Sequence, residues 1–247
     1  MQNLHLGTIG WSYSFWKGNF YPNKTASKDF LAYYAIKFGT VEVDSTFYRI
    51  PNQQTAINWK NQTPEGFLFS LKFPRVITHI KMLKDCQNET SAFLGKVALL
   101  KEKIGCLLLQ FPSAFGVQEF PLLGDFLESL PKEHRYVVEV RNKELLHEGL
   151  FSVLKSQNVA LAWIDSPIMP PVSEVTSDFL YVRLEGDRSQ VKGTLGKIEI
   201  DKKGDIQLWA DRIKPFVSKQ MEVFGYFGKY YSGYPPSDVS LFSSFSV

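Results

Sequence analysis

Three strand-like segments carry charged side chains at every second position, a pattern suited to building a polar site. The charged pairs are Glu42 with Asp44, Glu139 with Arg141, and Arg183 with Glu185. Side chains of a strand alternate between its two faces, so the members of each pair share a face. Carboxylates and guanidinium groups are costly to bury unless they are paired or used. The spacing therefore predicts a pocket lined by charges of both signs.

Three residues are candidates for proton transfer: Glu139 and Asp44 from these pairs, and His79. Carboxylates and imidazole are common general acids and bases, and the ordinary pKa of imidazole lies close to neutrality. His79 follows a predicted strand on a loop that also carries Arg75. The alternatives are structural, because Glu139 and Arg141 could form a salt bridge and His79 could be an ordinary hydrogen-bonded residue.

Three arginines near the ends of predicted strands indicate an anion-binding site. Arg75, Arg141 and Arg183 would hold a phosphate or carboxylate, since the planar guanidinium group binds such anions in a bidentate manner. Glu139 and Asp165 would offset part of their charge. The predicted substrate-binding residues are Trp11, Tyr48, Arg49, Lys72, Arg75, Gln110, Arg141, Asp165, Arg183 and Glu185. The aromatic members would stack on a sugar ring or base, or pack under loops.

Glu42 and Asp44 could instead bind a divalent cation, because hard metals prefer carboxylate ligands. No set of histidine ligands accompanies them, so ion pairs with Lys72 and Arg183 are the favoured interpretation. The sequence contains no Walker loop, Rossmann glycine fingerprint, nucleophile elbow or zinc-protease helix. We therefore expect neither a metal nor a cofactor.

Eight strand-like segments position these residues, most of which fall near the segments' carboxyl ends. The predicted strands are residues 4–10, 40–44, 67–73, 106–111, 136–141, 159–164, 179–184 and 221–227. Apolar residues spaced by three and four predict helices between most of them, at 30–38, 93–100, 123–130, 146–154 and 206–216. This alternation predicts an α/β fold with a parallel sheet, and specifically a single-domain (β/α)8 TIM-type barrel over residues 1–247.

Two connections depart from this regular alternation. Residues 165–178 contain three prolines and no helical pattern, so the crossover after the sixth strand is expected to be irregular. Residues 186–204 are polar and rich in glycine and lysine. They fit a solvated surface loop better than the alternative, a mobile lid.

The amino-acid composition limits the kinds of protein to which this chain could belong. The 247 residues are 44% apolar, enough for one large core. A net charge of +3 permits an anionic ligand but falls short of the basic character typical of nucleic-acid binders. Cys86 and Cys106 form no CxxC motif and are expected to be free thiols. A signal-peptide pattern and a run of about 18 apolar residues are both absent, so we expect a cytoplasmic protein without membrane contact.

Six sequence blocks, in order, resemble the YecE-like family, domain of unknown function 72. The blocks are GTIGWSYSFWKGNFYP, VEVDSTFYRIP, FLFSLKFPRVITH, LLLQFPSAF, VVEVRN and YVRLEG. The resemblance covers essentially the whole chain and implies a single-domain barrel of the (β/α)8 type. It implies no particular activity, because the name of the family records that none is assigned.

The chain departs from the pattern of this family at three positions that could carry chemistry. Asp44 stands where the family usually has asparagine, and Asn142 and Glu185 stand where it usually has histidine. Near the C-terminus, GKYYSGYPPSD replaces an asparagine-rich segment. One alternative is therefore a barrel that retains the scaffold and has lost catalysis.

Two other functions fit the residues. The first, which we favour, is an enzyme that acts on a small polar anionic substrate, phosphorylated or carboxylate, by acid/base chemistry at the carboxyl ends of the strands. The second is a nucleic-acid-binding or nucleic-acid-processing barrel, in which basic loops follow phosphates and aromatic residues receive a base. Basic residues that converge in a cup would favour the small ligand, whereas a basic stripe would favour nucleic acid.

Overall fold

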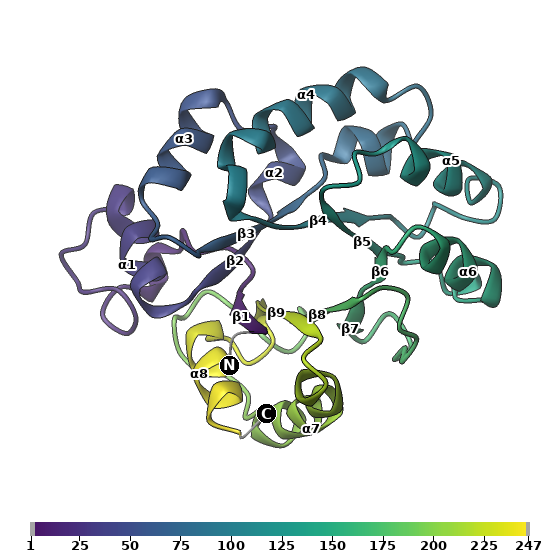
Figure 1. The fold of residues 1–247 in the computed structure, drawn as a ribbon. Coiled ribbons are helices and arrows are strands. Elements are labelled where there is room, and N and C mark those ends of the chain that lie inside the picture. The colour runs from purple at the N-terminus through teal and green to yellow at the C-terminus, as the bar shows by residue number, and fades with distance from the viewer. Residues whose placement is uncertain (1–2, 246–247) are drawn as a thin grey trace.

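Parallel strands form two sheets in the computed structural model, which describes residues 3–245 (Figure 1). The first sheet has the order β1-β9-β8-β7 and the second has the order β2-β3-β4-β5-β6. The strands are β1 (Leu4–Thr8), β2 (Thr40–Val43), β3 (Leu68–Lys72), β4 (Ile104–Gln110), β5 (Arg135–Glu139), β6 (Ala160–Leu161), β7 (Trp163–Asp165), β8 (Phe179–Gly186) and β9 (Glu222–Tyr230).

The two sheets meet along both of their edges. Residues 160–165 pair with β5 through β6 and with β8 through β7, and the ladder changes neighbour at Ala162, whose N–H donates to Val138 O at 2.9 Å. On the other side, β1 and β2 are joined by an isolated parallel bridge between Ile9 and Glu42. A Cβ atom on Gly7 would lie 2.2 Å from Thr40 O, so only glycine permits this close approach of β1 to β2.

Helices cover the outer face of each sheet. The α-helices are α1 (Phe30–Lys37), α2 (Ser45–Tyr48), α3 (Gln53–Asn61), α4 (Gln87–Val97), α5 (Pro121–Ser129), α6 (Glu148–Ser156), α7 (Lys203–Ser218) and α8 (Pro235–Ser244). Shorter helical turns are η1 (Ser14–Trp16), η2 (Ser27–Asp29), the π-helical η3 (Val76–Ile80), η4 (Ala98–Lys103) and η5 (Lys143–Leu145). In Figure 1, α3, α4 and α5 lie outside β3 and β4, and α7 and α8 lie outside β8 and β9.

Three apolar clusters bury both faces of the strands. One lies between the five-stranded sheet and its helices, and a second lies between the four-stranded sheet and α7 and α8. The third lies between the sheets, where Leu108 and Val137 of one sheet share a cluster with Tyr181, Phe224 and Tyr226 of the other. Burial on two faces explains the near-continuous apolar runs of the strands, as is usual in parallel sheets.

The predicted α/β class with parallel strands is confirmed, but a closed eight-stranded barrel is not. The predicted sixth strand is divided into β6 and β7, because its first half pairs with β5 and its second half with β8. The irregular crossover is confirmed, since residues 166–178 contain no helix. All five predicted helices are present as α1, α4, α5, α6 and α7, whereas α2, α3 and α8 were not predicted.

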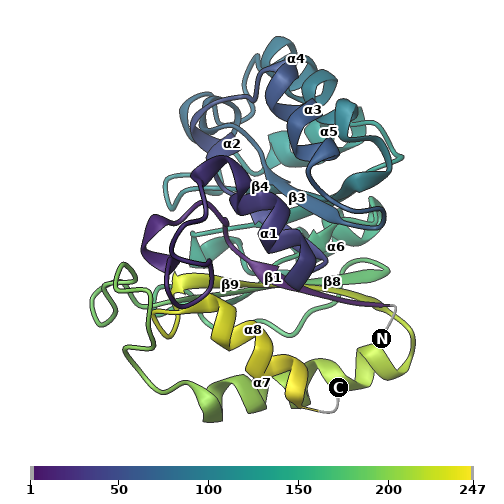
Figure 2. The same ribbon diagram turned by 90° about the vertical axis from the view of Figure 1, so that its left-hand side faces the viewer.

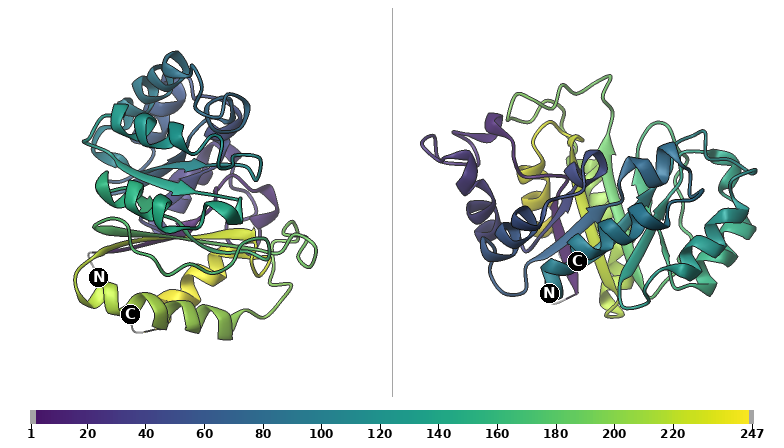
Figure 3. Two further views of the ribbon diagram at one scale, coloured as in Figure 1. Left: turned by 90° about the vertical axis from the view of Figure 1, so that its right-hand side faces the viewer. Right: turned by 90° about the horizontal axis from the view of Figure 1, so that it is seen from above.

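The two ends of the molecule differ. Figures 2 and 3 show both chain termini at one end, while the connection between β8 and α7 projects at the other. Cys86 and Cys106 are buried, unpaired thiols. None of the helices between residues 3 and 245 combines the length and apolar character that a membrane span requires.

Candidate functional site

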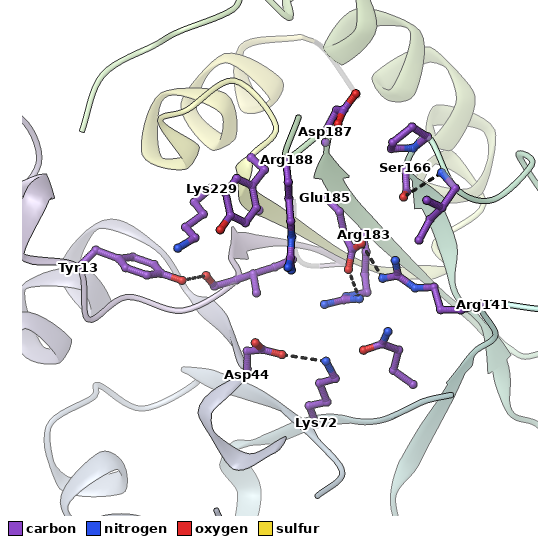
Figure 4. Close-up of a pocket in the computed structure, with 17 residues that line it drawn as sticks. Tyr13, Asp44, Lys72, Arg141, Ser166, Arg183, Glu185, Asp187, Arg188 and Lys229 are labelled. Carbon is purple, nitrogen blue, oxygen red and sulfur yellow. Dashed lines mark hydrogen bonds and ion pairs between the residues drawn. The ribbon is translucent and has the colours of Figure 1, made fainter. Parts of the chain in front are cut away.

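A cavity of about 410 Å³ opens at the carboxyl ends of the strands (Figure 4). Its volume lies in the lower part of the range typical of small-molecule sites. Strands β3, β4, β8 and β9 and the segments that follow β1, β2, β5 and β7 all contribute to its lining. The charged lining residues are Asp44, Lys72, Arg141, Arg183, Glu185, Asp187, Arg188 and Lys229.

Arg183 is the centre of an ion-pair network that forms the floor of this cavity. Its Nε and Nη2 donate to the two carboxylate oxygens of Glu42 at 2.9 and 2.7 Å. Its Nη1 donates to Glu139 and to Glu185, each at 2.5 Å. Arg141 completes the network, because its Nε donates to Glu139 and its Nη2 to Glu185, each at 2.5 Å. All six oxygens of the three glutamates therefore accept hydrogen bonds from arginine.

Burial and neighbouring charges have opposite effects on the pKa values of the residues in this floor. Burial disfavours a charged Arg183, but the attraction of three neighbouring glutamates outweighs it and raises the pKa of Arg183. Burial also opposes ionisation of Glu185, yet Arg183 and Arg141 lower its pKa to about 2. For Glu42, burial outweighs the attraction of Arg183 and raises the pKa. The floor is thus a self-contained set of two cations and three acids.

Lys72 and Asp44 form a second ion pair on the cavity wall. Lys72 Nζ lies 3.0 Å from Asp44 Oδ1 and 4.2 Å from the ring centroid of Phe47. Thr46 fixes the turn between them, since its hydroxyl lies within hydrogen-bond distance of Val43 O at 2.9 Å and Lys72 O at 2.7 Å. The Lys72 side chain is only 8% exposed, compared with 36% for Asp44, so the pair faces the cavity from a largely buried base.

The opposite wall carries two further cations and two tyrosines. Arg188 Cζ and Lys229 Nζ each lie 4.9 Å from the ring centroid of Tyr230, and Lys229 Nζ lies 5.8 Å from the ring centroid of Tyr13. The Tyr13 hydroxyl donates to Ile9 O at 2.9 Å. In Figure 4, Arg188 and Lys229 extend into the cavity from the wall that faces Asp44 and Lys72.

The connection between β8 and α7 is held against this wall. The Glu199 carboxylate accepts from the backbone N–H groups of Lys192 and Gly193 at 2.9 and 2.8 Å. Asn19 Nδ2 donates to Gly196 O at 2.7 Å. Gly196 has a φ of +63°, and a Cβ there would lie 1.9 Å from Phe15 O. The connection is therefore docked onto the segment after β1, where a side chain at residue 196 would not fit.

The structure brings most of the sequence-predicted site residues together. Asp44, Lys72, Gln110, Arg141, Arg183 and Glu185 line the cavity. Glu139 is fully buried beneath them, and Arg141 and Arg183 occupy both of its oxygens. The favoured ion-pair interpretation of Glu42 and Asp44 is confirmed, with Arg183 and Lys72 as the respective partners.

Other predicted residues lie outside the cavity lining. Tyr48 is 74% exposed, and Arg49 and Arg75 are also exposed. Trp11 packs edge-on against Trp59 with ring centroids 5.6 Å apart. The predicted anion clamp of Arg75 with Arg141 and Arg183 is therefore not assembled, because Arg75 lies apart from the cavity and glutamates engage the other two.

His79 also lies behind the cavity wall. Its ring packs edge-on against Phe47, with centroids 4.7 Å apart, and Nδ1 lies 2.9 Å from the Thr78 hydroxyl. Burial lowers the pKa of His79 to about 4, and Lys72, Arg75 and Arg141 add to the effect. The imidazole is accordingly neutral at pH 7. It sits on the π-helical turn η3, a type of turn that is frequent at functional sites.

Asp165 points to the outside of its sheet. Its Oδ2 accepts from Trp209 Nε1 at 2.8 Å and from the Tyr231 hydroxyl at 3.2 Å. It lines a separate hollow of about 290 Å³ between β7 and α7. A larger groove of about 620 Å³ lies between α4 and α5, away from the strand ends.

The predicted substrate-binding set omitted several residues of the cavity wall. Ser166, Asp187, Arg188, Lys229 and Tyr230 line the cavity, and they directly follow or end β7, β8 and β9. Extending each strand pattern by four residues would have included them. Within residues 3–245, no group of three or more histidine, cysteine, aspartate or glutamate side chains is arranged to hold a metal ion.

Comparisons with known proteins agree on one family. The model of a family described as "Protein of unknown function DUF72" matches residues 5–244. The chain is 39% identical over 116 residues to the UPF0759 protein YecE of Escherichia coli K12, and 32% identical over 122 residues to the UPF0759 protein YunF of Bacillus subtilis 168. Each match spans 47% of this chain. The matches cover less than half of the curated relatives, 43% of YecE and 42% of YunF.

Solved structures share the fold over nearly the full length. A DUF72 family protein from Thermotoga maritima superimposes with a TM-score of 0.82 at 23% identity, covering 97% of both chains. A DUF72 family protein from Enterococcus faecalis gives a TM-score of 0.76 at 20% identity, covering 97% of this chain and 94% of that one. At these identities the likeness concerns the fold alone.

Proposed function

Because this chain belongs to the DUF72 family, whose description assigns no activity, we propose a function from the cavity itself. The protein is an enzyme that acts on a small polar anionic molecule by acid/base chemistry. Its two sheets serve as one (β/α)8-type barrel, the scaffold in which active sites lie at the carboxyl ends of the strands. Two unpaired buried thiols fit a reducing compartment, so the cytoplasm remains the proposed location.

The observation that carries this proposal is the Lys72–Asp44 pair, which opens onto the cavity beside the arginine–glutamate floor. The ammonium and carboxylate lie 3.0 Å apart, so one can donate and the other can accept a proton at the same substrate atom or its neighbour. Glu139 and His79, the other predicted acid/base residues, fit a supporting role better. Arginines occupy both oxygens of Glu139, and His79 does not line the cavity.

The distribution of basic residues favours a small ligand over nucleic acid. Five of them converge on one cavity: Lys72, Arg141, Arg183, Arg188 and Lys229. A basic stripe across the surface would instead be expected of a protein that follows a nucleic-acid backbone. The nucleic-acid alternative would use exposed basic and aromatic residues outside the cavity. Exposed residues of these kinds are Tyr48, Arg49 and Arg75.

The three residues that depart from the family pattern also support a site that still functions. Asp44 pairs with Lys72, and Glu185 pairs with Arg141 and Arg183, so both carboxylates balance cations at the cavity. Asn142 has a local role, since its side chain accepts from the backbone N–H of Glu144 at 3.0 Å and caps η5. These contacts argue for altered chemistry rather than for an abandoned site.

The proposal is tested by turnover of a panel of sugar phosphates and organic acids, followed by proton NMR in D2O. This readout scores both loss of substrate and exchange of carbon-bound protons. We expect Lys72→Met and Asp44→Asn each to lower the rate by about 100-fold or more, the usual loss when a general acid or base is removed. Lys197→Gln removes an exposed charge outside the cavity and should retain the rate. Turnover at the wild-type rate by Lys72→Met would contradict the assignment.

A further inference from the structure

We propose that Arg188 and Lys229 form a subsite for a phosphate monoester, which is the anionic end of the substrate. The inference rests on the proposed function in taking the cavity as the substrate site, and it adds the class of substrate. Arg188 follows β8 and Lys229 lies near the end of β9, so neighbouring strands present the two cations side by side. Each lies 4.9 Å from the ring centroid of Tyr230. Figure 4 shows both cations at the cavity.

The two cations have no acidic partner among residues 3–245. No carboxylate there comes within ion-pair distance of Arg188 or Lys229. The adjacent Asp187 is used locally. Its Oδ1 accepts from the N–H and hydroxyl of Ser189 at 2.8 and 2.7 Å, and its Oδ2 accepts from Gln190 at 2.9 Å. Both oxygens of Asp187 are thus engaged by Ser189 and Gln190, and no ion pair joins Asp187 to Arg188.

The floor of the cavity does not compete for the anion. Three glutamates offset the charges of Arg141 and Arg183, so the floor carries no excess positive charge. Lys72 is neutralised by Asp44. An anion that enters the cavity is thus attracted less by the floor than by the opposite wall, where positive charge is unpaired.

The charge of the subsite selects the kind of anion. Two unpaired cations match a phosphate monoester, which carries about 1.5 to 2 negative charges at pH 7, better than a single carboxylate. The guanidinium group offers bidentate hydrogen bonds to phosphate oxygens, and the ammonium group adds a point charge. With the phosphate at this wall, the organic part of a small ligand extends across the cavity toward Lys72 and Asp44.

The wall is also held in place before any ligand binds. The contacts of Glu199 and Gly196 described above fix the connection that contains Arg188. The backbone N–H groups of Glu199 and Ile200 also donate to Ser232 O, just after β9, at 2.7 and 3.2 Å. A preorganised site loses less conformational entropy on binding.

Isothermal titration of inorganic phosphate and of glycerol 3-phosphate into the full chain, at constant ionic strength, tests the subsite. We expect Arg188→Gln and Lys229→Gln each to weaken binding of both probes at least tenfold. Lys197→Gln, which neutralises an exposed cation on the same connection, should match the wild type. Both subsite variants should keep the wild-type melting temperature or exceed it, because each removes one of two neighbouring like charges.

Three outcomes would overturn the subsite. The first is no binding of either probe to the wild type at millimolar concentrations, and the second is unchanged affinity in both subsite variants. The third concerns the source of the phosphate: a 5′-phosphorylated single-stranded oligonucleotide that binds far more tightly than glycerol 3-phosphate would replace the small molecule by nucleic acid.

The titration is independent of catalysis. A variant that combines Lys72→Met with Asp44→Asn removes this ion pair without changing the net charge of the cavity, so it should bind inorganic phosphate with wild-type affinity. Loss of turnover in that variant therefore tests the proposed function, whereas loss of phosphate binding in Arg188→Gln tests the subsite. Either can fail without the other.

Discussion

Arg183 and Arg188 are five positions apart and line the same cavity, yet their surroundings are opposite. Arg183 is 2% exposed and contacts three glutamates, whereas Arg188 is exposed and contacts the ring of Tyr230. Breaking a buried ion pair leaves its partner as an uncompensated charge, which typically costs about 3–5 kcal/mol. An exposed charge without a partner contributes little to folding.

We therefore expect Arg183→Met to lower the free energy of unfolding by about 3–5 kcal/mol, mainly because Glu42 would remain buried without its arginine partner. Glu139 would keep Arg141 alone. Arg188→Met, the matched control, should stay within about 0.5 kcal/mol of the wild type. Urea unfolding followed by circular dichroism measures both. Equal stability of the two variants would show that the floor does not depend on Arg183.

At the scale of single residues, strand alternation predicted which side chains share a face but not which face that is. This was enough for Asp44, Lys72, Arg141 and Arg183, which converge as expected. It failed for Asp165, whose side chain turns outward to Trp209 of α7. From the sequence, Arg188 was predicted to lie in a solvated loop. Its place on the cavity wall depends on the turn at Asp187, and such a turn has no periodic pattern in the sequence.

At the scale of secondary-structure elements, α8 carries a buried acid in its first turn. Asp238 is 3% exposed and accepts a hydrogen bond from the Ser232 hydroxyl at 2.7 Å. Burial raises the pKa of Asp238 to about 7, although the hydrogen bonds of Ser232 and the charge of Lys202 act to lower it. The folded state therefore holds a proton on Asp238 at pH values where the unfolded chain has released it.

This difference makes the docking of α8 dependent on pH. Between the ordinary pKa of 3.8 and about 7, the folded state binds more protons at Asp238 than the unfolded state does, so the stability supplied by this residue falls as the pH rises. Asp238→Asn keeps an acceptor for Ser232 and removes the ionisation. We expect the variant to be more stable than the wild type at pH 8, by a few kcal/mol at most, and to differ little at pH 4.

Urea unfolding at several pH values between 4 and 8 measures this effect. Asp125→Asn, an exposed aspartate on α5, is the control and should follow the wild type throughout. A stability difference between Asp238→Asn and wild type that does not change with pH would contradict a neutral, buried Asp238.

Element prediction succeeded where a helix buries a regular apolar stripe. Helices α5 and α6 bury apolar residues at spacings of three and four, and both were predicted. Helix α3 buries only Ala56, and α2 is a single turn, so neither carries a helical hydrophobic period. Helix α8 begins with two prolines and is rich in serine, features that resemble a loop in sequence.

For the whole molecule, local patterns predicted the α/β class and the order of the strands along the chain. Whether the sheets close depends on hydrogen bonds between segments that are distant in sequence, and a period of two or 3.6 residues carries no information about them. The bridge between Ile9 and Glu42 and the change of partner at Ala162 are contacts of this kind. The net charge of +3 likewise did not reveal the separation of a charge-balanced floor from a positive wall within one cavity.

A crystal structure of the protein with glycerol 3-phosphate tests the central claim most directly, namely that the cavity at the carboxyl ends of the strands is the substrate site. The account predicts the ligand inside this cavity, with its phosphate against Arg188 and Lys229 and its glycerol carbons toward Lys72 and Asp44. An ordered ligand in the groove between α4 and α5, or at the exposed Arg49 and Arg75, with this cavity unoccupied, would contradict it.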